Sequence, residues 1–549
     1  MTLLNKHRAF FILIAFAATL FLSDIWAYKE FVRAESYFAL GARSMVERHE
    51  WLTPHAPDEL QLNKPPLTYW LIGTSYKLLG ASYGAARLPS VLAAIGVLAT
   101  VYLLGRWRYG NRAGLISAAM LASSYLFVSF ARLAMSDTML TLCVTAAFAC
   151  FIAALTEQTP RSRKLVFVGY VALALGVLTK GPVALALVAI PIGLELIVRR
   201  DRASFKRLRI LPGLGLFLAI AAPYFFLVYA RVGLGPLRFF FLGENLQRFT
   251  GQIYESGARP FWYELAAFFS DFAPWSLLLP LAAWRRAERE KTSTGVTRVL
   301  YLWLVYTVIL FSLASFKRDY YLLPAMPAAA LIIGPLIANI ESLPKFARRI
   351  VAGFLVICGV GLLAGALLSL RAAALLSVQT LFRFLPPVIA LVGLVLVFTW
   401  IRRRKTWQAS LILAATIWAT ILSLQLILLP AFVRYQPTAQ LAAGIPAGRV
   451  VYTSRAADEW ASSLAFNLPP PYSVERLSGD VDDQELLDIL VRDPRAVAVI
   501  WEREYARLVQ GDPALKIIAR VETFGHGGLS LNLIRHPARQ HLYLIGHDY

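Results

Sequence analysis

The sequence predicts a polytopic α-helical membrane protein with about 13 transmembrane helices and a small external α/β domain at its C-terminal end. Of its 549 residues, 58% are hydrophobic, against roughly 45–50% in soluble domains. Apolar runs of about 20 residues, the length that spans a bilayer, recur over residues 1–429. The formal charge is +22, but Lys and Arg lie in short clusters between the apolar runs. That pattern is typical of inside loops of membrane proteins and argues against a nucleic-acid-binding face.

The apolar runs set the spans in order. The first, at about residues 9–28, follows Lys6 and Arg8, which places the N-terminus inside. It resembles a signal peptide without a small-residue cleavage site, so we expect it to remain as a helix. The other spans are expected at about residues 84–105, 113–131, 138–156, 165–179, 183–198, 210–230, 263–283, 299–315, 322–340, 350–370, 386–401 and 407–429.

Two long polar segments, residues 29–66 and 231–262, are expected outside, because every predicted inside loop is basic. The transmembrane part therefore covers residues 1–429, and residues 430–549 form an external domain. Alternating and β-branched runs in that domain predict strands, and an acidic start predicts a helix at Asp482–Val491. The predicted strands are Val450–Thr453, Ala496–Trp501, Lys516–Val521 and Leu529–Ile534.

Cations on the predicted outside favour an anionic ligand there. Lys64 lies in Gln61–Trp70, where two consecutive prolines forbid regular helix and hold its backbone extended. A rigid cation beside aromatic side chains suits an anionic lipid headgroup. The alternative is that Lys64 only extends to the membrane interface.

Further charged stretches lie at the outer ends of spans. Glu35 follows the first span, in Arg33–Phe38, and is either a functional carboxylate or half of a solvated ion pair. Asp137 begins the span after Arg132–Asp137, where a carboxylate also caps a helix. In Ser315–Leu323, Lys317 and Arg318 suit a phosphate, or belong to an interfacial belt with the tyrosines.

The remaining candidates carry weaker signals. Phe239–Gly251 is rich in aromatic residues, which suits a lipid chain, a sugar or an ordinary interfacial helix. The first loop contains four histidine and acidic residues that are not spaced as metal ligands are, and we interpret them as part of a polar loop. They are His49, His55, Asp58 and Glu59. The three cysteines lie inside apolar spans and indicate neither disulfides nor a metal site.

Several motifs, in order over about residues 9–340, resemble those of bacterial GT-C membrane glycosyltransferases. This family comprises the protein O-mannosyltransferase relatives, including the lipid A aminoarabinose transferase. The motifs are ARSMVERHEWLTPH, LNKPPLTYWL, AARLPSVLA, RLAMSDTML, LTKGPVAL, ENLQRFTG, RPFWYEL, APWSLLLP and SLASFKRDYYLLPAMPA.

The resemblance implies a GT-C fold, and a reaction in which a sugar leaves a polyprenyl phosphate. It implies an acidic general base in the first external loop, where relatives show Asp-Glu and this chain has Ala34-Glu35. Glu35 is thus the predicted base, and Asp137 matches the second acidic position. Fixed cations would stabilise the departing phosphate, and a carboxylate would accept the acceptor's proton.

The same resemblance assigns the other side chains. The predicted phosphate ligands are Lys64, Lys317, Arg318 and Tyr321. The predicted substrate-binding residues are Arg33, Tyr37, Asn63, Asn245 and Arg248, with Asn63 and Asn245 standing where relatives have Glu and His. No cofactor is required, and a divalent metal beside Glu35 and Asp137 is left open.

The sequence therefore predicts an inner-membrane transferase that moves a sugar from a polyprenyl phosphate to lipid A, another glycolipid or a protein. The N-terminus is expected inside and the C-terminal domain in the periplasm. A transporter of lipid-linked sugars is the alternative from another class, but no internal repeat supports it. A non-catalytic glycan-binding relative stays open because of Ala34.

Overall fold

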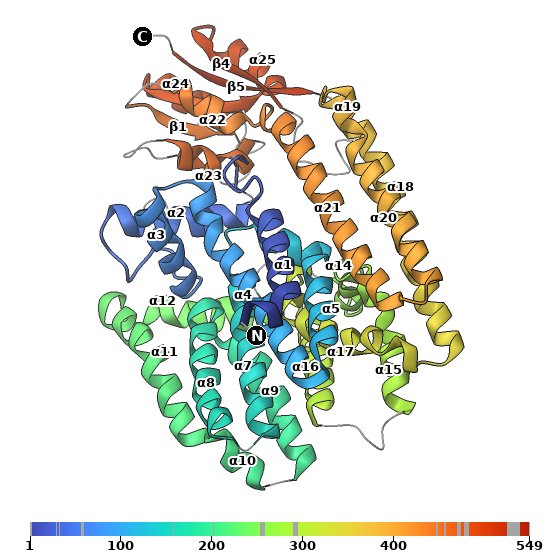
Figure 1. The fold of residues 1–549 in the computed structure, drawn as a ribbon. Helices are drawn as coiled ribbons and strands as arrows, with labels where there is room; N and C mark the ends of the chain where they lie inside the picture. Colours follow the sequence, from blue (N-terminus) through green and yellow to red (C-terminus); the bar gives the residue numbers. More distant parts are fainter. Residues whose placement is uncertain are drawn as a thin grey trace.

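The computed structural model describes most of the chain and places a helical bundle beneath a small sheet domain (Figure 1). The residues that it describes are 3–28, 30–31, 33–55, 60–157, 159–200, 202–252, 259–288, 295–445, 448–454, 457–468, 474–476, 483–523 and 539–547. The predicted fold class is confirmed.

Within the described residues, ten helical stretches are long and apolar enough to cross a membrane. Six are single helices: α4 (Tyr83–Tyr109), α7 (Ser136–Thr156), α8 (Pro160–Lys180), α9 (Pro182–Arg199), α16 (Gly295–Leu313) and α18 (Lys345–Leu375). Four join neighbouring helices: α10 (Arg202–Leu208) with α11 (Ile210–Val232), η4 (Asp319–Ala325) with α17 (Met326–Ala338), α19 (Thr380–Arg383) with α20 (Leu385–Arg402), and α21 (Thr406–Val433) with α22 (Pro437–Ala443).

The predicted count of about 13 spans is higher than this count because three predicted spans do not form long straight helices. The first span corresponds to α1 (Leu3–Leu22), whose described apolar part is shorter than a full span. The third is divided between α5 (Asn111–Ala122) and α6 (Tyr125–Phe130). The Ser124 hydroxyl donates to the Met120 carbonyl at this break, and such side-chain bonds compete with helix continuation.

The predicted eighth span is bent by 106° between α14 (Tyr263–Asp271) and the helical segment Trp275–Arg286. Pro274 stands at the bend and has no backbone N–H to continue the helix. That second segment comprises η2 (Trp275–Leu278) and most of α15 (Leu279–Glu288). Counting the bent pair as one span gives eleven candidates in the described part of the chain.

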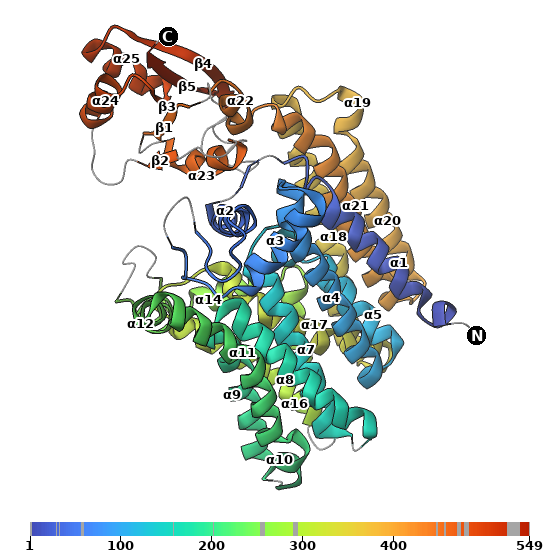
Figure 2. The ribbon, with the colours of Figure 1, turned by 90° about the vertical axis from the view of Figure 1, so that its left-hand side faces the viewer.

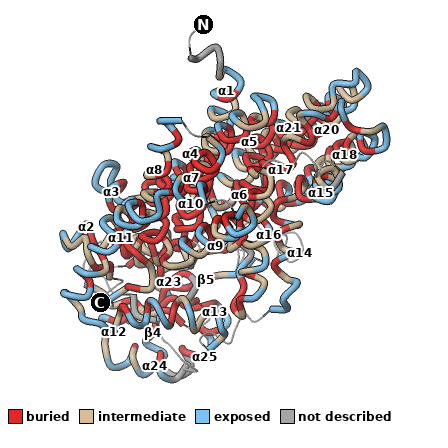
Figure 3. Tube along the Cα trace, turned by 90° about the horizontal axis from the view of Figure 1, so that it is seen from below, coloured by how far each residue is buried: buried red, intermediate tan, exposed pale blue. Residues whose placement is uncertain are grey.

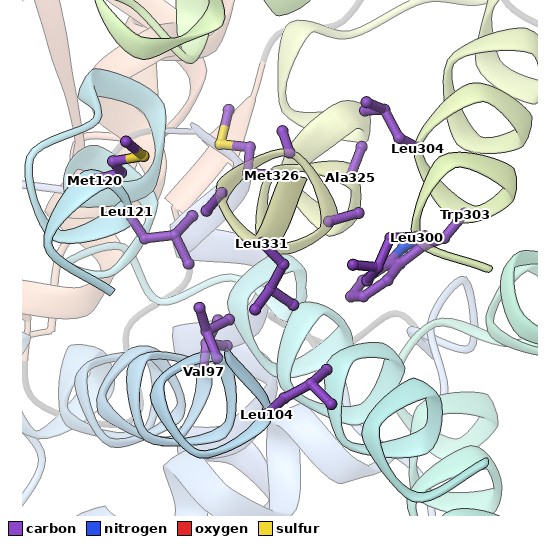
Figure 4. Close-up of a cluster of buried hydrophobic side chains, with 14 of the residues drawn as sticks. Val97, Leu104, Met120, Leu121, Leu300, Trp303, Leu304, Ala325, Met326 and Leu331 are labelled. Atoms are coloured by element: carbon purple, nitrogen blue, oxygen red, sulfur yellow. The ribbon is translucent and has the colours of Figure 1, made fainter. Parts of the chain in front are cut away.

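The centre of the bundle is closely packed, and its outer helices expose apolar side chains as lipid-facing helices do (Figure 3). Figure 4 shows side chains from α4, α5, α16 and α17 meeting in this core. Trp303 is fully buried and stacks on Phe148 of α7 with ring centroids 4.2 Å apart. A Cβ at Gly334 would lie 2.0 Å from the Ser117 hydroxyl oxygen, so glycine permits the close approach of α17 to α5.

Several short elements lie at the end of the bundle that faces the sheet domain. They are α2 (Arg33–Glu47), α3 (Leu67–Leu79), α12 (Leu234–Arg238), the π-helix η1 (Phe239–Gln247) and α13 (Arg248–Thr250). Figure 2 shows α2 between the sheet domain and the bundle. At the opposite end, the short helix η5 (Ile340–Ser342) follows α17.

The C-terminal domain contains a mixed five-stranded sheet of order β2-β1-β3-β5-β4. Its strands are β1 (Val450–Thr453), β2 (Val474–Arg476), β3 (Ala496–Trp501), β4 (Leu515–Thr523) and β5 (Gln540–His547). The predicted bounds of β1 and β3 are confirmed, whereas β2 and β5 were not predicted. The predicted strand Leu529–Ile534 lies outside the described residues.

Helices cover both faces of this sheet. Val497 and Val499 pack towards α22 and α23 (Asp458–Asn467), while Ala498 and Ile500 pack towards α24 (Asp483–Arg492) and α25 (Glu502–Gly511). Alternate residues of one strand thus fill two separate cores, as the two-residue period of a strand requires.

Hydrogen bonds hold the sheet domain to α2 and to Phe31, which precedes that helix. The Phe31 N–H donates to the Ser463 hydroxyl at 2.9 Å. Arg43 donates to the backbone carbonyls of Phe466 at 2.8 Å and Leu468 at 3.2 Å. The orientation of α2 therefore depends on residues more than 400 positions away in the chain.

Candidate functional site

A cavity of about 1080 Å³ lies beneath α2, at the ends of α7, α8 and α16 that face the sheet domain. Its wall mixes apolar residues from these helices with charged side chains from the connecting segments. The charged residues that line it are Lys64, Asp137, Lys180, Glu244, Arg248 and Arg318.

Lys64 and Arg248 share one carboxylate in this wall. Glu244 Oε2 accepts from Lys64 Nζ at 3.1 Å and from an Arg248 guanidinium nitrogen at 3.0 Å. The side chain of Glu244 is only 3% exposed, so little water screens the cluster. Burial lowers the pKa of Lys64, and the neighbouring Glu244 carboxylate opposes that shift. An anion thus already lies between two cations in the cavity wall.

The backbone explains how these side chains reach the cavity. Pro65 and Pro66 follow Lys64 and lead into α3, which begins at Leu67. Glu244 lies on the π-helix η1, an arrangement often found at functional sites. The Arg248 guanidinium carbon also lies 4.3 Å from the centre of the Phe316 ring, which holds the planar group in place.

A second charged pair joins Asp137 to Lys180. Asp137 lies in the first turn of α7, and its Oδ1 accepts from Lys180 Nζ at 2.5 Å. Lys180 ends α8, and Gly181 with a φ of +79° allows the tight turn into α9. The Lys180 ammonium also lies 4.9 Å from the centre of the Tyr321 ring. This pair lines the same cavity as Lys64 and Arg248.

Glu35, which the sequence predicts as the general base, does not line this cavity. Its oxygens accept from Arg87 of α4 at 2.9 and 3.1 Å and from the Ala134 N–H at 2.8 Å. The cavity is lined instead by Ala34, Tyr37 and Phe38 of the same helix. One residue turns an α-helix by about 100°, so with Ala34 towards the cavity Glu35 faces α4. The prediction of a cavity-facing Glu35 beside Arg33 is therefore wrong.

Lys317, a predicted phosphate ligand, is not among the described residues that line the cavity. It is buried, donates to the Ala314 carbonyl and is absent from the described cavity lining, whereas Arg318 lines the cavity. Arg318 has extended backbone, in which adjacent side chains point to opposite sides. Burial lowers the pKa of Lys317, and the Glu264 carboxylate opposes this shift. Lys317 is therefore not a member of the cavity cluster.

The other predicted substrate-binding residues fall into two groups. Tyr37, Asn63 and Asn245 line the cavity, as does the predicted phosphate ligand Tyr321. The Asn245 amide donates to the Phe240 carbonyl at 2.7 Å, which fixes its orientation within η1. Arg33 begins α2, but its side chain lies outside the described residues.

The described side chains offer no group of three metal-binding residues. The metal left open beside Glu35 and Asp137 gains no support from their surroundings, because each carboxylate pairs with a cation: Arg87 and Lys180 respectively. His55 bonds within its own loop, and Asp58 and Glu59 lie outside the described residues.

The sequence analysis missed Glu244 and assigned no role to Lys180. Glu244 stands in the ENLQRFTG motif, four residues before Arg248, and that spacing pairs them on one helical face. Lys180 stands in LTKGPVAL, where a lysine beside Gly-Pro at the end of an apolar span was the available signal.

A second, smaller cavity of about 350 Å³ lies at the other ends of α4, α16 and α17. It is lined by three arginines, Arg108, Arg285 and Arg286, over an apolar floor that includes Leu331 and Leu336. Thr297 and Tyr301 of α16 line this cavity, whereas Leu310 and Phe311 of that helix line the larger one.

Comparisons with known proteins agree with the motifs. Residues 63–227 match the family model described as dolichyl-phosphate-mannose-protein mannosyltransferase. The chain is 30% identical over 341 residues to the undecaprenyl phosphate-alpha-4-amino-4-deoxy-L-arabinose arabinosyl transferase of Pectobacterium carotovorum, covering 61% of this chain and 59% of that protein. It is 31% identical over 309 residues to the enzyme of the same description in Pseudomonas aeruginosa, covering 55% and 54%.

The whole chain also resembles a solved structure. The crystal structure of ArnT from Cupriavidus metallidurans, bound to undecaprenyl phosphate, aligns with a TM-score of 0.72 and 20% identity over 97% of this chain and 98% of that one. This similarity establishes the fold. The sequence matches span about three-fifths or less of the length of the curated relatives. Together, these comparisons confirm the predicted resemblance.

Proposed function

We propose that this chain is a polyprenyl-phosphate-dependent glycosyltransferase of the inner membrane, acting from its external side. It transfers a sugar to an envelope acceptor, either a lipid A-type glycolipid or a protein. The observation that carries this proposal is the cavity of about 1080 Å³ in which Lys64, Arg248 and Arg318 meet an apolar wall. A lipid-linked phosphate presents the complementary combination of a charged group and a long apolar chain.

The cations bind the donor phosphate. Arg248 and Arg318 offer planar forks suited to phosphate oxygens, and Lys64 adds a point charge. Tyr321 contributes a hydroxyl beside them. When the sugar leaves, the bond between its anomeric carbon and the phosphate oxygen breaks, and the phosphate keeps the electron pair. Cations already in position stabilise that charge without rearrangement.

Glu244 acts as an internal counter-ion of the donor site. Its carboxylate lies between Lys64 and Arg248, where a phosphate oxygen would make the same bonds. Donor binding therefore displaces Glu244 from one or both cations. Before the donor binds, the Glu244 carboxylate thereby neutralises these two cations in the cavity wall.

Asp137 is the carboxylate best placed to accept the acceptor's proton. It lines the cavity, whereas Glu35 bonds Arg87 behind α2. As the acceptor oxygen forms its bond to the anomeric carbon, its proton passes to the Asp137 carboxylate, which Lys180 Nζ holds in place by a hydrogen bond. Glu35 is a positioning residue, since it ties α2 to α4 and to the Ala134 N–H, three residues before Asp137.

The comparisons support the class of donor. The relatives in Pectobacterium and Pseudomonas are named as transferases that use an undecaprenyl phosphate-linked aminoarabinose, and the ArnT crystal structure holds undecaprenyl phosphate. The N-terminus is assigned to the cytoplasm and the sheet domain to the periplasm by the basic loops.

One observation favours a second candidate function, a lipid-phosphate-binding relative without transferase activity. Ala34 faces the cavity where relatives carry a carboxylate by the motif resemblance, and Glu35 does not replace it there. Such a protein would bind the donor lipid and leave the sugar in place.

The deciding experiment uses the purified full-length chain with an undecaprenyl-phosphate sugar and an envelope-lipid extract. Mass spectrometry detects the glycosylated product, and a separate titration measures donor binding. Asp137→Asn should keep donor binding and lose about 10²–10⁴-fold in transfer rate, the usual loss for a general base. Donor binding without any product from the unmodified chain, over extracts of lipids and of proteins, would establish the second candidate instead.

A further inference from the structure

Two neutral amides flank the charged pair that the proposed function assigns to the donor phosphate. Asn63 comes directly before Lys64 in the chain, and Asn245 comes directly after Glu244 on η1. Lys64 Nζ donates to Glu244 Oε2 at 3.1 Å, so this bond joins the two segments that carry the amides. Asn63 and Asn245 both line the cavity of about 1080 Å³. The two amides therefore lie beside the groups that would hold a phosphate.

A sugar carried by that phosphate comes next to these amides. In a polyprenyl-phosphate sugar, a phosphate oxygen is bonded directly to the anomeric carbon, so the sugar ring fills the space beside the phosphate ligands. Successive residues of a chain are only about 3.8 Å apart at Cα. The residues adjacent to Lys64 and Glu244 are thus within reach of the polar groups of the sugar.

Both amide groups are able to bond to sugar hydroxyl groups. The Asn63 backbone carbonyl accepts from Lys64 Nζ at 3.0 Å, and its half-buried side-chain amide borders the cavity. One N–H of the Asn245 amide donates to the Phe240 carbonyl at 2.7 Å, which fixes the group and leaves its oxygen and its second N–H for a ligand. An amide donates and accepts, as a sugar hydroxyl does, so the two kinds of group satisfy one another without any charge.

A protonated amine on the sugar would meet a wall whose acidic groups are already engaged. Asp137 and Glu244 line the cavity, and each bonds to a cation of the wall. Lys180 donates to Asp137, while Lys64 and Arg248 donate to Glu244. An ammonium that bonds to either carboxylate competes with these fixed cations, which also repel it. A hydroxyl group in the same place bonds to the amides without competing for either carboxylate.

We propose that Asn63 and Asn245 determine the sugar specificity by bonding to hydroxyl groups, and that the donor carries a neutral sugar and not an amino sugar. This inference rests on the proposed function, which supplies the position of the donor phosphate. It separates this chain from the relatives in Pectobacterium and Pseudomonas, whose names specify an aminoarabinose. The cations are assigned to the phosphate, and the amides to the sugar.

The test compares two donors that differ by one group. L-arabinose and 4-amino-4-deoxy-L-arabinose, each linked to undecaprenyl phosphate, are titrated into the purified full-length chain at neutral pH and followed by tryptophan fluorescence. The hydroxyl donor should bind at least about tenfold more tightly, because the amine adds a positive charge among cations. Asn63→Asp should reduce this ratio at least about fivefold, because a carboxylate attracts the ammonium. Asn63→Ala should weaken the hydroxyl donor about two- to tenfold and leave sugar-free undecaprenyl phosphate unchanged.

The matched control is Asn339→Asp, which adds the same charge at an exposed amide on the opposite end of the bundle. It should keep the donor ratio of the unmodified chain. Equal binding of the two donors, or equal ratios in Asn63→Asp and Asn339→Asp, would overturn the inference. Tighter binding of the amino donor would also overturn it, and loss of that preference in Glu244→Gln would assign the amine to Glu244.

Sugar-free undecaprenyl phosphate separates this inference from the proposed function. A chain that does not bind it would overturn both, whereas a chain that binds it and shows no preference between the two donors would overturn the sugar inference alone. If Asn63→Asp does not fold, a pH series on the unmodified chain decides. Raising the pH until the amine loses its proton should narrow the difference between the donors, and any loss of charge at Lys64 affects both donors alike. A ratio that stays constant over this range would refute the inference.

Discussion

The carboxylate of Glu244 gives the proposed donor site a built-in competitor, and Glu244→Gln should therefore tighten donor binding. Its Oε2 accepts from Lys64 at 3.1 Å and Arg248 at 3.0 Å. Bonds between charged partners contribute about 1.5–3 kcal/mol, and neutral ones about 0.5–1.5 kcal/mol. Replacing the carboxylate by an amide keeps the shape and weakens the hold on each cation by about 1 kcal/mol or more.

A phosphate that displaces the amide instead of the carboxylate, from one or both cations, thus gains about 1–2 kcal/mol, which corresponds to about five- to thirtyfold tighter binding. The assay is a titration of purified full-length protein with undecaprenyl phosphate, followed by intrinsic tryptophan fluorescence at fixed ionic strength. Glu47→Gln is the matched control, because Glu47 pairs with Arg43 at 2.6 Å outside the cavity, with its side chain 43% exposed. The control should bind the lipid as the unmodified chain does.

The opposite sign would refute the reasoning. If Glu244 served only to hold Lys64 and Arg248 in place, removal of its charge would loosen both cations and weaken donor binding. A folded Glu244→Gln protein that binds undecaprenyl phosphate more weakly than the unmodified chain, or equally, would show that no displacement takes place. Thermal unfolding of the variant supplies the check that it is folded.

Three further predictions concern the same scaffold. Arg87→Ala should lower the free energy of unfolding by about 3–5 kcal/mol, because it removes the ion-pair partner of the buried Glu35. Thermal unfolding in detergent measures this change. A loss below about 1 kcal/mol would contradict the importance of the Arg87–Glu35 pair. Donor binding should weaken as the pH rises, starting below the ordinary lysine pKa of 10.5, because the lowered pKa of Lys64 lets its ammonium lose a proton at a lower pH. Lys64→Arg should remove this pH dependence of binding. If both proteins show the same pH profile, a group other than Lys64 causes it. Reporter fusions after Arg209 and after Tyr435 should report opposite sides of the membrane, and agreement between them would overturn the topology.

The membrane fold could be predicted from the sequence because its signals are local and strong. Length and apolarity of the runs located most spans, and the β-branched runs located β1 and β3 to the residue. The errors arose where a span was interrupted. Ser124 and Pro274 break predicted helices through a side-chain hydrogen bond and a missing N–H, and an average over an apolar run is insensitive to both.

The site was less predictable, because it depends on which way neighbouring side chains turn. Glu35 and Lys317 have the right chemistry, but Ala34 and Arg318 take the cavity-facing positions beside them. One face of α2 lines the cavity, and the other packs against other parts of the chain. The hydrophobic pattern of α2 therefore does not specify how the helix is rotated about its own axis. Glu244 was missed for a related reason, since its pairing with Lys64 joins positions 180 residues apart.

The attachment of α2 to the sheet domain imposes an order on biosynthesis. The bond from Phe31 to Ser463 joins residues 432 positions apart. At about 5–20 residues per second, roughly 20–90 s of translation separate the first partner from the second. During that interval α2, which carries Ala34, Tyr37 and Phe38 of the cavity wall, has no sheet domain to rest on. The cavity wall that α2 forms is therefore completed only after the sheet domain has been made, and an unfinished chain lacks a finished cavity.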